Sequence, residues 1–376
     1  MRFHWSVLLI LLTTSVIVVG CSNVGFDSIP KLSCSNIDIS RDQNTTCFNS
    51  PNSVTVSFTF GVGDVDILFV NDNSGSMFVE QQKMAQAFPN FLSEISSLFY
   101  RIAITTTDVV ATKGKFLEFV DEQNNSSGLT VIDRNTPNVS GLFRGTIQRN
   151  ETRLCDLSGF NPNHCPSQDE RGIYAANLAI KNGDKNFFRP GAHMALVILS
   201  DEDERSNGGK SGFPPLEAYD LPETLVLNLK NLYPTKSMSV HSVVTNDETC
   251  RQQQTQTSKT GIWPTLGYIG TQYMMLSNPS ADLLALGNLQ SGVVGSICAS
   301  DYGAQLGNIA ANISDNTLDA PKQLACAPDS KTINIVTSPV GYEKQIQYYI
   351  DYKDKIYFSK LPIGVKVTFS YDCPRY

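Results

Sequence analysis

Short apolar runs alternate with amphipathic segments through the middle of the chain. Residues 65–70, VDILFV, form a short and mostly apolar run of the kind that makes a buried strand. Residues 80–99 then carry apolar side chains spaced three and four apart, which predicts a helix with a kink allowed at Pro89. The same alternation predicts strands at 100–108, 115–122, 193–204 and 237–247 and helices at 171–182, 222–233, 281–290 and 301–313. Such alternation predicts an α/β fold, a doubly wound and mostly parallel sheet with helices on both faces.

The chain changes character near residue 321. Residues 366–371, KVTFSY, alternate with period two, and residues 351–358 resemble the corner of a hairpin. The surrounding segment is rich in β-branched and aromatic residues with turn residues between them. We therefore predict a small C-terminal all-β domain at 319–376, after an α/β domain at 61–318.

The N-terminal residues indicate export. Arg2 precedes an apolar run at 6–20 that ends at Cys21, as in a secretory signal peptide over residues 1–20. The alternative is a membrane-spanning helix, but the run is shorter than the roughly 20 residues that a span requires. Residues 21–60 are rich in Ser, Asn, Asp and Pro, so we predict a polar tether there.

Cysteine content and charge support this picture. The chain of 376 residues contains 9 Cys and has a formal net charge of −7, which argues against nonspecific nucleic-acid binding. Without Cys21, an even set remains, which suggests disulfides in an exported chain. Zinc is disfavoured because no CxxC pair is present and only 4 His occur. Many connectivities are possible, and nearness in sequence favours Cys34–Cys47, Cys155–Cys165, Cys250–Cys298 and Cys326–Cys373.

The strand at 65–70 ends in a cluster of small oxygen-bearing side chains. Asp72, Ser74 and Ser76 alternate there, and Gly75 allows a tight turn. Because parallel α/β sheets place ligands at the carboxyl ends of their strands, these oxygens are candidate ligands for a hard cation, Mg²⁺ or else Mn²⁺ or Ca²⁺. Neutral hydroxyls would leave the cation able to accept a carboxylate from a partner. The alternative is that these side chains only cap the following helix.

The segment DILFVNDNSGSM resembles the first motif of von Willebrand factor A domains, and the resemblance covers residues 64–313. In that family, Asp-x-Ser-x-Ser forms a metal-ion-dependent adhesion site, and the matching residues are Asp72, Ser74 and Ser76. The segment MALVILSDEDE resembles the last metal loop of the family, which implies Asp201 as a ligand. Glu202 stands where Gly is usual, and Asp203 is a neighbouring candidate.

The middle metal loop departs from the family pattern. The family has a Thr before a helix, whereas CPSQDERGIYAANLAI has none, and Glu170 stands nearest that position with Ser167 and Asp169 close by. A carboxylate there would tighten metal binding and weaken the pull of the metal on an acidic ligand. The alternative for Glu170 is a solvated surface acid, and for Asp201 a capping or turn carboxylate. Thr106, Thr107 and Asp108 are expected near the same edge.

The end of the apolar leader, VVGC, resembles the lipobox of bacterial lipoproteins, and the chain as a whole resembles lipoproteins that contain a von Willebrand factor A domain. The resemblance implies cleavage before Cys21 and lipid attachment to it. In such lipoproteins an Asp directly after the lipidated Cys resembles a signal for retention in the inner membrane, and this chain has Ser22 at that position. We therefore expect a protein anchored by lipid to the bacterial outer membrane, facing the periplasm or the cell surface.

Three functions fit these features. The favoured one is a binding or adhesion module, not an enzyme, whose divalent metal captures an acidic group of a protein or glycan partner. The second is a structural envelope protein in which the metal only rigidifies the site and the β tail binds. The third is a metal-dependent hydrolase, which is disfavoured because hydrolases that use hard metals usually gather more carboxylates or His. No Ser–His–Asp or Cys–His set is readable either.

Overall fold

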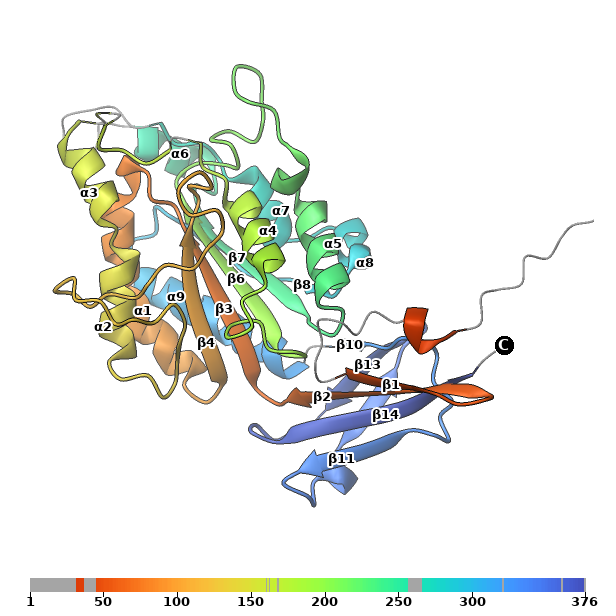
Figure 1. The fold of residues 1–376 in the computed structure, drawn as a ribbon. Helices are drawn as coiled ribbons and strands as arrows, with labels where there is room; N and C mark the ends of the chain where they lie inside the picture. The colour runs from red at the N-terminus through yellow and green to blue at the C-terminus, as the bar shows by residue number, and fades with distance from the viewer. Residues whose placement is uncertain are drawn as a thin grey trace, which may run out of the picture.

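A seven-stranded sheet forms the centre of the larger part of the protein (Figure 1). The computed structural model describes residues 32–36, 45–159, 161, 163–167, 169–255, 266–319, 321–359 and 361–374. The strand order is β5-β4-β3-β6-β7-β8, with β9 also paired to β7. The bounds are β3 (Asp64–Asn71), β4 (Phe99–Thr106), β5 (Ile132–Asp133), β6 (His193–Ser200), β7 (Met238–Val244), β8 (Leu289–Gln290) and β9 (Val294–Ser296). Every pair is parallel except β4 with β5, which confirms the predicted fold class.

Helices cover both faces of this sheet, because its central strands are apolar on both sides. One face packs against α1 (Phe78–Ile95), α2 (Val139–Ile147) and α9 (Tyr302–Asp319). The other packs against α4 (Gly172–Asn182), α5 (Pro222–Leu232), α7 (Thr271–Ser277) and α8 (Ala281–Leu286). Toward the carboxyl ends of the strands lie α3 (Asn150–Leu157) and α6 (Glu248–Thr255) (Figure 1). Short 3-10 helices occur at η1 (Cys34–Asn36), η2 (Gly75–Met77), η3 (Ala218–Asp220) and η4 (Glu343–Gln345).

The predicted strand at 115–122 is wrong. This segment bonds to β4 at two points, where Leu117 N donates to Ile104 O (2.8 Å) and Thr105 Oγ1 donates to Lys115 O (2.9 Å), and then folds back on itself. The carboxylate of Asp121 accepts bonds from the amides of Gln123 and Asn125, which closes a local turn. The edge position is instead filled by β5. By contrast, α1 continues through Pro89.

The smaller part of the protein consists of two antiparallel sheets. One has the order β1-β2-β14-β11 and the other the order β10-β13-β12. Their bounds are β1 (Thr45–Asn49), β2 (Ser53–Gly61), β10 (Lys322–Gln323), β11 (Asn334–Ser338), β12 (Gln347–Ile350), β13 (Lys355–Ser359) and β14 (Lys366–Pro374). Aromatic and aliphatic side chains of β2, β13 and β14 form its core. The predicted C-terminal β structure is therefore present.

This β part also contains N-terminal strands, so the predicted tether at 21–60 needs correction. Strand β2 pairs along its whole length with β14, from Ser53 opposite Pro374 to Gly61 opposite Lys366. Its alternate side chains, Val54, Val56, Phe58 and Phe60, are buried. Only Val62 and Gly63 separate β2 from β3, so one chain segment passes directly from the β part into the central sheet.

All four predicted disulfides are present: Cys34–Cys47, Cys155–Cys165, Cys250–Cys298 and Cys326–Cys373. Such a set indicates an exported protein. The predicted signal peptide at 1–20 and the lipid site at Cys21 lie outside the described residues. Within the described part of the chain, no helix has the length and apolar character needed to cross a bilayer.

Candidate functional site

The predicted first motif lies at the carboxyl end of β3, the central strand of the sheet. The Asp72 amide donates to Leu199 O of β6 (2.9 Å), which fixes the start of the loop. Asp72 Oδ1 accepts a bond from Ser74 N (2.8 Å), and Asp72 Oδ2 accepts one from Ser200 Oγ (2.6 Å). The hydroxyls of Ser74 and Ser76 are 3.0 Å apart. The three predicted oxygens thus converge at one point.

Asp201 reaches the same point from the neighbouring strand β6. Ser76 Oγ donates to Asp201 Oδ1 (3.2 Å), while the Asp201 carbonyl accepts bonds from Thr245 Oγ1 (2.8 Å) and Tyr268 N (3.2 Å). Ser74 is the N-cap residue of η2, yet its side chain makes no capping bond. The capping interpretation of the motif is therefore not supported, and the structure brings Asp72, Ser74, Ser76 and Asp201 together.

Glu170 lies just before α4 and is only 3% exposed, so the interpretation of it as a solvated surface acid is wrong. Its carbonyl accepts a bond from Arg205 N (2.6 Å), and its Oε2 accepts one from Ser206 Oγ (2.7 Å). The carboxyl groups of Glu170 and Glu202 influence each other's pKa, and the charge of Asp72 raises the pKa of Glu170. Glu170 therefore belongs to the cluster.

The other residues expected near this edge have different roles. Thr107 lies beside the Asp72 carboxylate and slightly lowers its pKa, so it belongs to the surroundings of the site. Asp108 instead accepts from the amides of Val110, Ala111 and Ser167, and Asp169 pairs with Arg205 (2.9 Å). These contacts shape the loop around the cluster.

Asp203 and Glu204 hold helices rather than a ligand position. Asp203 Oδ1 accepts a bond from Gln272 N (2.9 Å) in the first turn of α7. The carboxylate of Glu204 accepts bonds from Ile173 N (2.8 Å) and Tyr174 N (3.0 Å) in the first turn of α4. A carboxylate at a helix N-terminus satisfies free backbone donors and stabilises the helix. Asp203 Oδ1 therefore has a structural role, although Asp203 Oδ2, like Asp201 Oδ2, is buried without a hydrogen-bond partner.

Four carboxyl groups lie close together at this edge, of which Asp72, Asp201 and Glu170 are buried and Glu202 is half-buried. Burial raises the pKa of Asp72, and burial together with the charge of Asp72 raises the pKa of Asp201 well above its ordinary value. Burial and then Asp72 raise the pKa of Glu170 to about 7, and burial and then Glu170 raise the pKa of Glu202. None of the ion pairs formed by the described residues includes any of these four side chains.

The donor set of this cluster is suited to a hard divalent cation. Asp201 Oδ2 is buried and has no hydrogen-bond partner, which is costly for a carboxylate oxygen. Carboxylates and hydroxyls are the ligands that Mg²⁺ and Ca²⁺ prefer. In the described part of the chain, however, no three His, Cys, Asp and Glu side chains alone are arranged to hold an ion. Any cation site here would thus depend on the hydroxyls of Ser74 and Ser76.

Sequence reasoning missed two members of the cluster, Ser200 and Glu202. Ser200 follows Leu199, which is paired with Asn71, so the β3–β6 register places Ser200 beside Asp72. Knowledge of that register would have identified it. Glu202 was noted only as a departure from the family's Gly, and its contact with Glu170 depends on how the loop before α4 folds.

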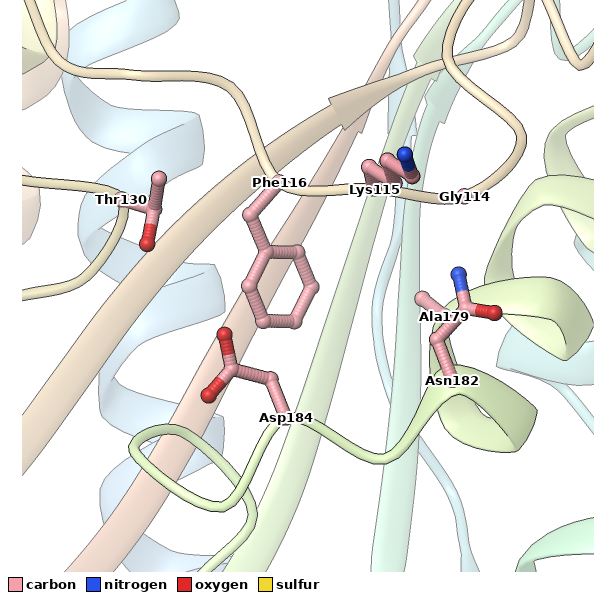
Figure 2. A pocket seen from close by; sticks show the side chains of 7 residues that line it. All are labelled: Gly114, Lys115, Phe116, Thr130, Ala179, Asn182 and Asp184. Carbon is pink, nitrogen blue, oxygen red and sulfur yellow. The ribbon is translucent and has the colours of Figure 1, made fainter.

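A pocket of about 400 Å³ lies away from this cluster. Figure 2 shows its lining, in which the ring of Phe116 points toward the loop that carries Asp184. Ala179 and Asn182, at the end of α4, form the opposite side, whereas Glu170 precedes the start of that helix. The pocket therefore lies about a helix length from the carboxyl cluster.

No family model and no curated protein matches the chain. Among solved structures, the chain is similar to a pilus adhesin from Lactobacillus rhamnosus GG, with 12% identity over 88% of this chain and 43% of the other, and a TM-score of 0.38. It is also similar to a von Willebrand factor type A protein from Catenulispora acidiphila, with 11% identity over 85% of this chain and 60% of the other, and a TM-score of 0.32. For the manganese-loaded TRAP protein from Plasmodium vivax, the identity is 12% over 86% of this chain and 98% of the other, and the TM-score is 0.30.

These similarities are weak, and the chain spans only 43% and 60% of the first two structures. The assignment of an α/β fold therefore rests on the strand order and the two helical layers of the chain itself.

Proposed function

We propose that this protein is an exported, non-enzymatic binding module that holds a divalent cation at the carboxyl edge of its central sheet and engages an acidic group of a protein or glycan partner. The observation that carries the proposal is the chain of contacts from Asp72 through Ser74 and Ser76 to Asp201, which ends in an unpartnered buried oxygen. A bound cation would supply positive charge at this edge. Lipid attachment at Cys21 and outer-membrane location belong to the same proposal.

Each residue has a distinct part in this proposal. Asp72 and Asp201 supply negative charge from two adjacent strands, and both are locked by bonds to backbone or hydroxyl groups. Ser74 and Ser76 supply neutral oxygens, so they add ligands without adding charge. Glu170 and Glu202 add carboxyls beside this set, which favours retention of a cation and reduces its attraction for an outside carboxylate.

That last feature supports a second candidate, in which the cation only stabilises the edge. Buried carboxyls that repel one another destabilise the fold until a cation or protons neutralise them. The two candidates differ in what reaches the cation. In the first, a partner carboxylate completes its ligand set, whereas in the second the side chains of this chain are sufficient.

The first test replaces both hydroxyls, as Ser74→Ala with Ser76→Ala. In EDTA-treated protein, titration with Mg²⁺, Mn²⁺ or Ca²⁺ should raise the melting temperature of the wild type, and the double variant should bind the ion at least tenfold more weakly by calorimetry. Ser96→Ala is the matched control, because Ser96 is at the exposed end of α1 and bonds only locally to Ser93 O. Equal ion affinity in all three proteins would contradict a cation site at Ser74 and Ser76.

A second measurement separates the two candidates. Poly-L-glutamate beads present carboxylates, and poly-L-glutamine beads present the same backbone without charge. The adhesive function predicts retention on poly-L-glutamate only with the divalent ion, and loss of retention in the double Ser variant. Thermal stabilisation by the ion without ion-dependent retention would favour the purely structural role.

A further inference from the structure

The β12–β13 hairpin has an outward face rich in tyrosine. Tyr349 and Tyr357 are cross-strand partners, with ring centroids 4.6 Å apart and an angle of 2° between the rings. The neighbouring pair, Tyr348 and Phe358, points the other way. Their ring centroids lie 5.9 Å and 5.8 Å, respectively, from that of Phe369. Since side chains alternate between the faces of a sheet, Tyr349 and Tyr357 lie on the face away from that core.

The ring of Tyr349 is largely open to solvent, whereas that of Tyr357 is half-buried. Tyr349 is 61% exposed although one side of its ring lies against Tyr357, so the exposed area is the opposite side and the edge. Tyr352, at the turn that follows β12, is 89% exposed. We refer to Tyr349, Tyr352 and Tyr357 as the tyrosine face. Exposed aromatic rings that can stack and also hydrogen-bond are common in binding surfaces.

Cationic side chains border the tyrosine face. Lys353 Nζ lies 5.4 Å from the ring centroid of Tyr352. Lys355 Nζ donates to Gly287 O (3.3 Å), and Lys230 Nζ of α5 donates to the adjacent carbonyl, Leu286 O (2.9 Å). The two ammonium groups thus converge at the end of α8, where each uses only one of its donors on these carbonyls.

The acidic group nearest this face is engaged within the turn. Asp351 Oδ1 accepts bonds from the amides of Lys353 and Lys355, both at 2.9 Å. Its Oδ2 accepts one from the Tyr357 hydroxyl (3.3 Å). Among the ion pairs of the described residues, none includes Lys230, Lys353 or Lys355. Asp351 and Asp354 in the turn offset part of the charge of Lys230, Lys353 and Lys355. Three ammonium groups and two carboxylates leave a local excess of one positive charge beside the rings, although the whole chain has a net charge of −7.

We propose that the tyrosine face, together with Lys230 and Lys355, binds an acidic polysaccharide. The apolar face of a pyranose ring can lie on Tyr349 or Tyr352, while the carboxylate of a uronic acid binds the ammonium groups of the lysines. Charge complementarity selects an acidic sugar over a neutral one. A peptide strand added to β12, the edge strand of its sheet, would use backbone bonds and would not need the lysines.

This surface is separate from the carboxyl cluster. It lies where β13 and the end of α8 meet, below α5 and α8 in Figure 1, whereas the cluster lies at the opposite end of the central sheet near α6. Binding there needs no cation, so the test is made in EDTA throughout. Its outcome is then independent of the proposed metal-dependent function.

The test is affinity electrophoresis of the protein in gels that contain polygalacturonate, with gels of uncharged dextran for comparison. Polygalacturonate should retard the wild type, and dextran should not. Tyr349→Ala with Tyr352→Ala, and separately Lys230→Gln with Lys355→Gln, should weaken retardation at least tenfold. Tyr349→Phe keeps the ring and should bind within twofold of the wild type, as should Lys366→Gln, an exposed lysine of β14 elsewhere in the β part.

Several results would overturn the proposal. They are absence of retardation of the wild type, equal retardation by dextran, or an equal loss in Lys366→Gln. Poly-L-glutamate in place of the polysaccharide tests for a general acidic ligand, and equally tight binding that survives Tyr349→Ala with Tyr352→Ala would exclude a sugar site. Because the exchanged side chains lie at the surface, unchanged melting temperatures would confirm that the variants are folded.

Discussion

At the scale of single residues, four acidic side chains at the edge formed by the carboxyl ends of the strands influence one another's protonation. Asp72, Asp201, Glu170 and Glu202 lie in a volume where burial disfavours each charge and each carboxylate opposes its neighbours. The metal-free fold therefore favours their protonated forms. A divalent cation requires the deprotonated forms, so pH and metal must act against one another at this edge.

The pH dependence of stability follows from Glu170. Its pKa in the fold is about 7, above the ordinary 4.5, so the folded protein binds this proton more tightly than the unfolded chain. The contribution of this proton to the free energy of unfolding is fully present below pH 4.5 and is lost as the pH rises through 7. The change is on the order of 3 kcal/mol. In EDTA, urea unfolding should show the wild type losing stability relative to Glu170→Gln between pH 5 and pH 8.

Saturating Mg²⁺ should reduce or reverse that difference, because the ion replaces the proton at the cluster. Glu170→Gln is a suitable reference because it keeps the shape and removes the charge. If wild type and variant followed the same pH profile in EDTA, Glu170 would have to be ionised freely in the fold.

The sequence was sufficient to predict those site residues that directly follow a predicted strand. Asp72, Ser74 and Ser76 follow an apolar strand directly, and Asp201 ends another, so their convergence could be expected from a parallel sheet. Ser200 could not be placed without the register of two strands that are distant in sequence. The contact between Glu170 and Glu202 depends on loop geometry, which no periodicity encodes.

At the scale of elements, a buried ion cluster joins strands at the other end of the sheet. Lys236 Nζ lies 2.6 Å from Asp66 Oδ2, and both side chains are fully buried. Arg189 Nε lies 2.8 Å from Asp66 Oδ1 and also bonds to the carbonyls of Val65 and Phe99. This cluster connects β3, the start of β4 and the segments that precede β6 and β7.

Replacement of Lys236 by Met should therefore destabilise the protein strongly. Removal of one partner of a buried ion pair typically costs about 3–5 kcal/mol. Because Asp66 keeps its pairing with Arg189, the loss in Lys236→Met should lie near the lower end of this range. Arg251→Met is the matched control, because Arg251 pairs with Glu248 at the surface and such pairs contribute about 1 kcal/mol or less. The measurement is the free energy of urea unfolding, and similar losses for both variants would contradict the account of the buried cluster.

Prediction of elements succeeded where burial follows a simple period and failed where pairing is remote. The strands β6 and β7 are buried throughout and β3 is buried from Val65 onward, and all three are mostly apolar in sequence. Residues 53–60, SVTVSFTF, alternate clearly, but their polar surroundings suggested a tether, and their partner β14 lies more than 300 residues away. Residues 115–122 bury only Phe119 fully, and the other apolar side chains of this loop are half-buried.

At the scale of the whole molecule, disulfides close segments of very different length. Cys326–Cys373 spans 47 residues and encloses most of the C-terminal β part, whereas Cys155–Cys165 spans 10. In the chain-entropy model, a longer closed loop restricts the unfolded state more. The β part also has a small core, which makes it more dependent on such a constraint.

Replacement of Cys326 and Cys373 by Ser should thus cost more than replacement of Cys155 and Cys165. The loop lengths alone predict a difference of about 1.4 kcal/mol in the free energy of unfolding. Urea unfolding of both variants, with the remaining three disulfides verified by mass spectrometry, measures it. A larger loss from the Cys155–Cys165 pair would mean that local structure around α3, rather than loop closure, dominates.

The short connection from β2 to β3 has a mechanical consequence. The N-terminal strands enter the central sheet at Asp64, and the carboxyl cluster begins at the far end of that eight-residue strand, roughly 26 Å away. A protein held by its N-terminal segment would display this edge toward the medium. A pulling force between such an anchorage and a captured partner would act along the axis of β3. The hydrogen bonds of β3 to β4 on one side and to β6 on the other would resist it.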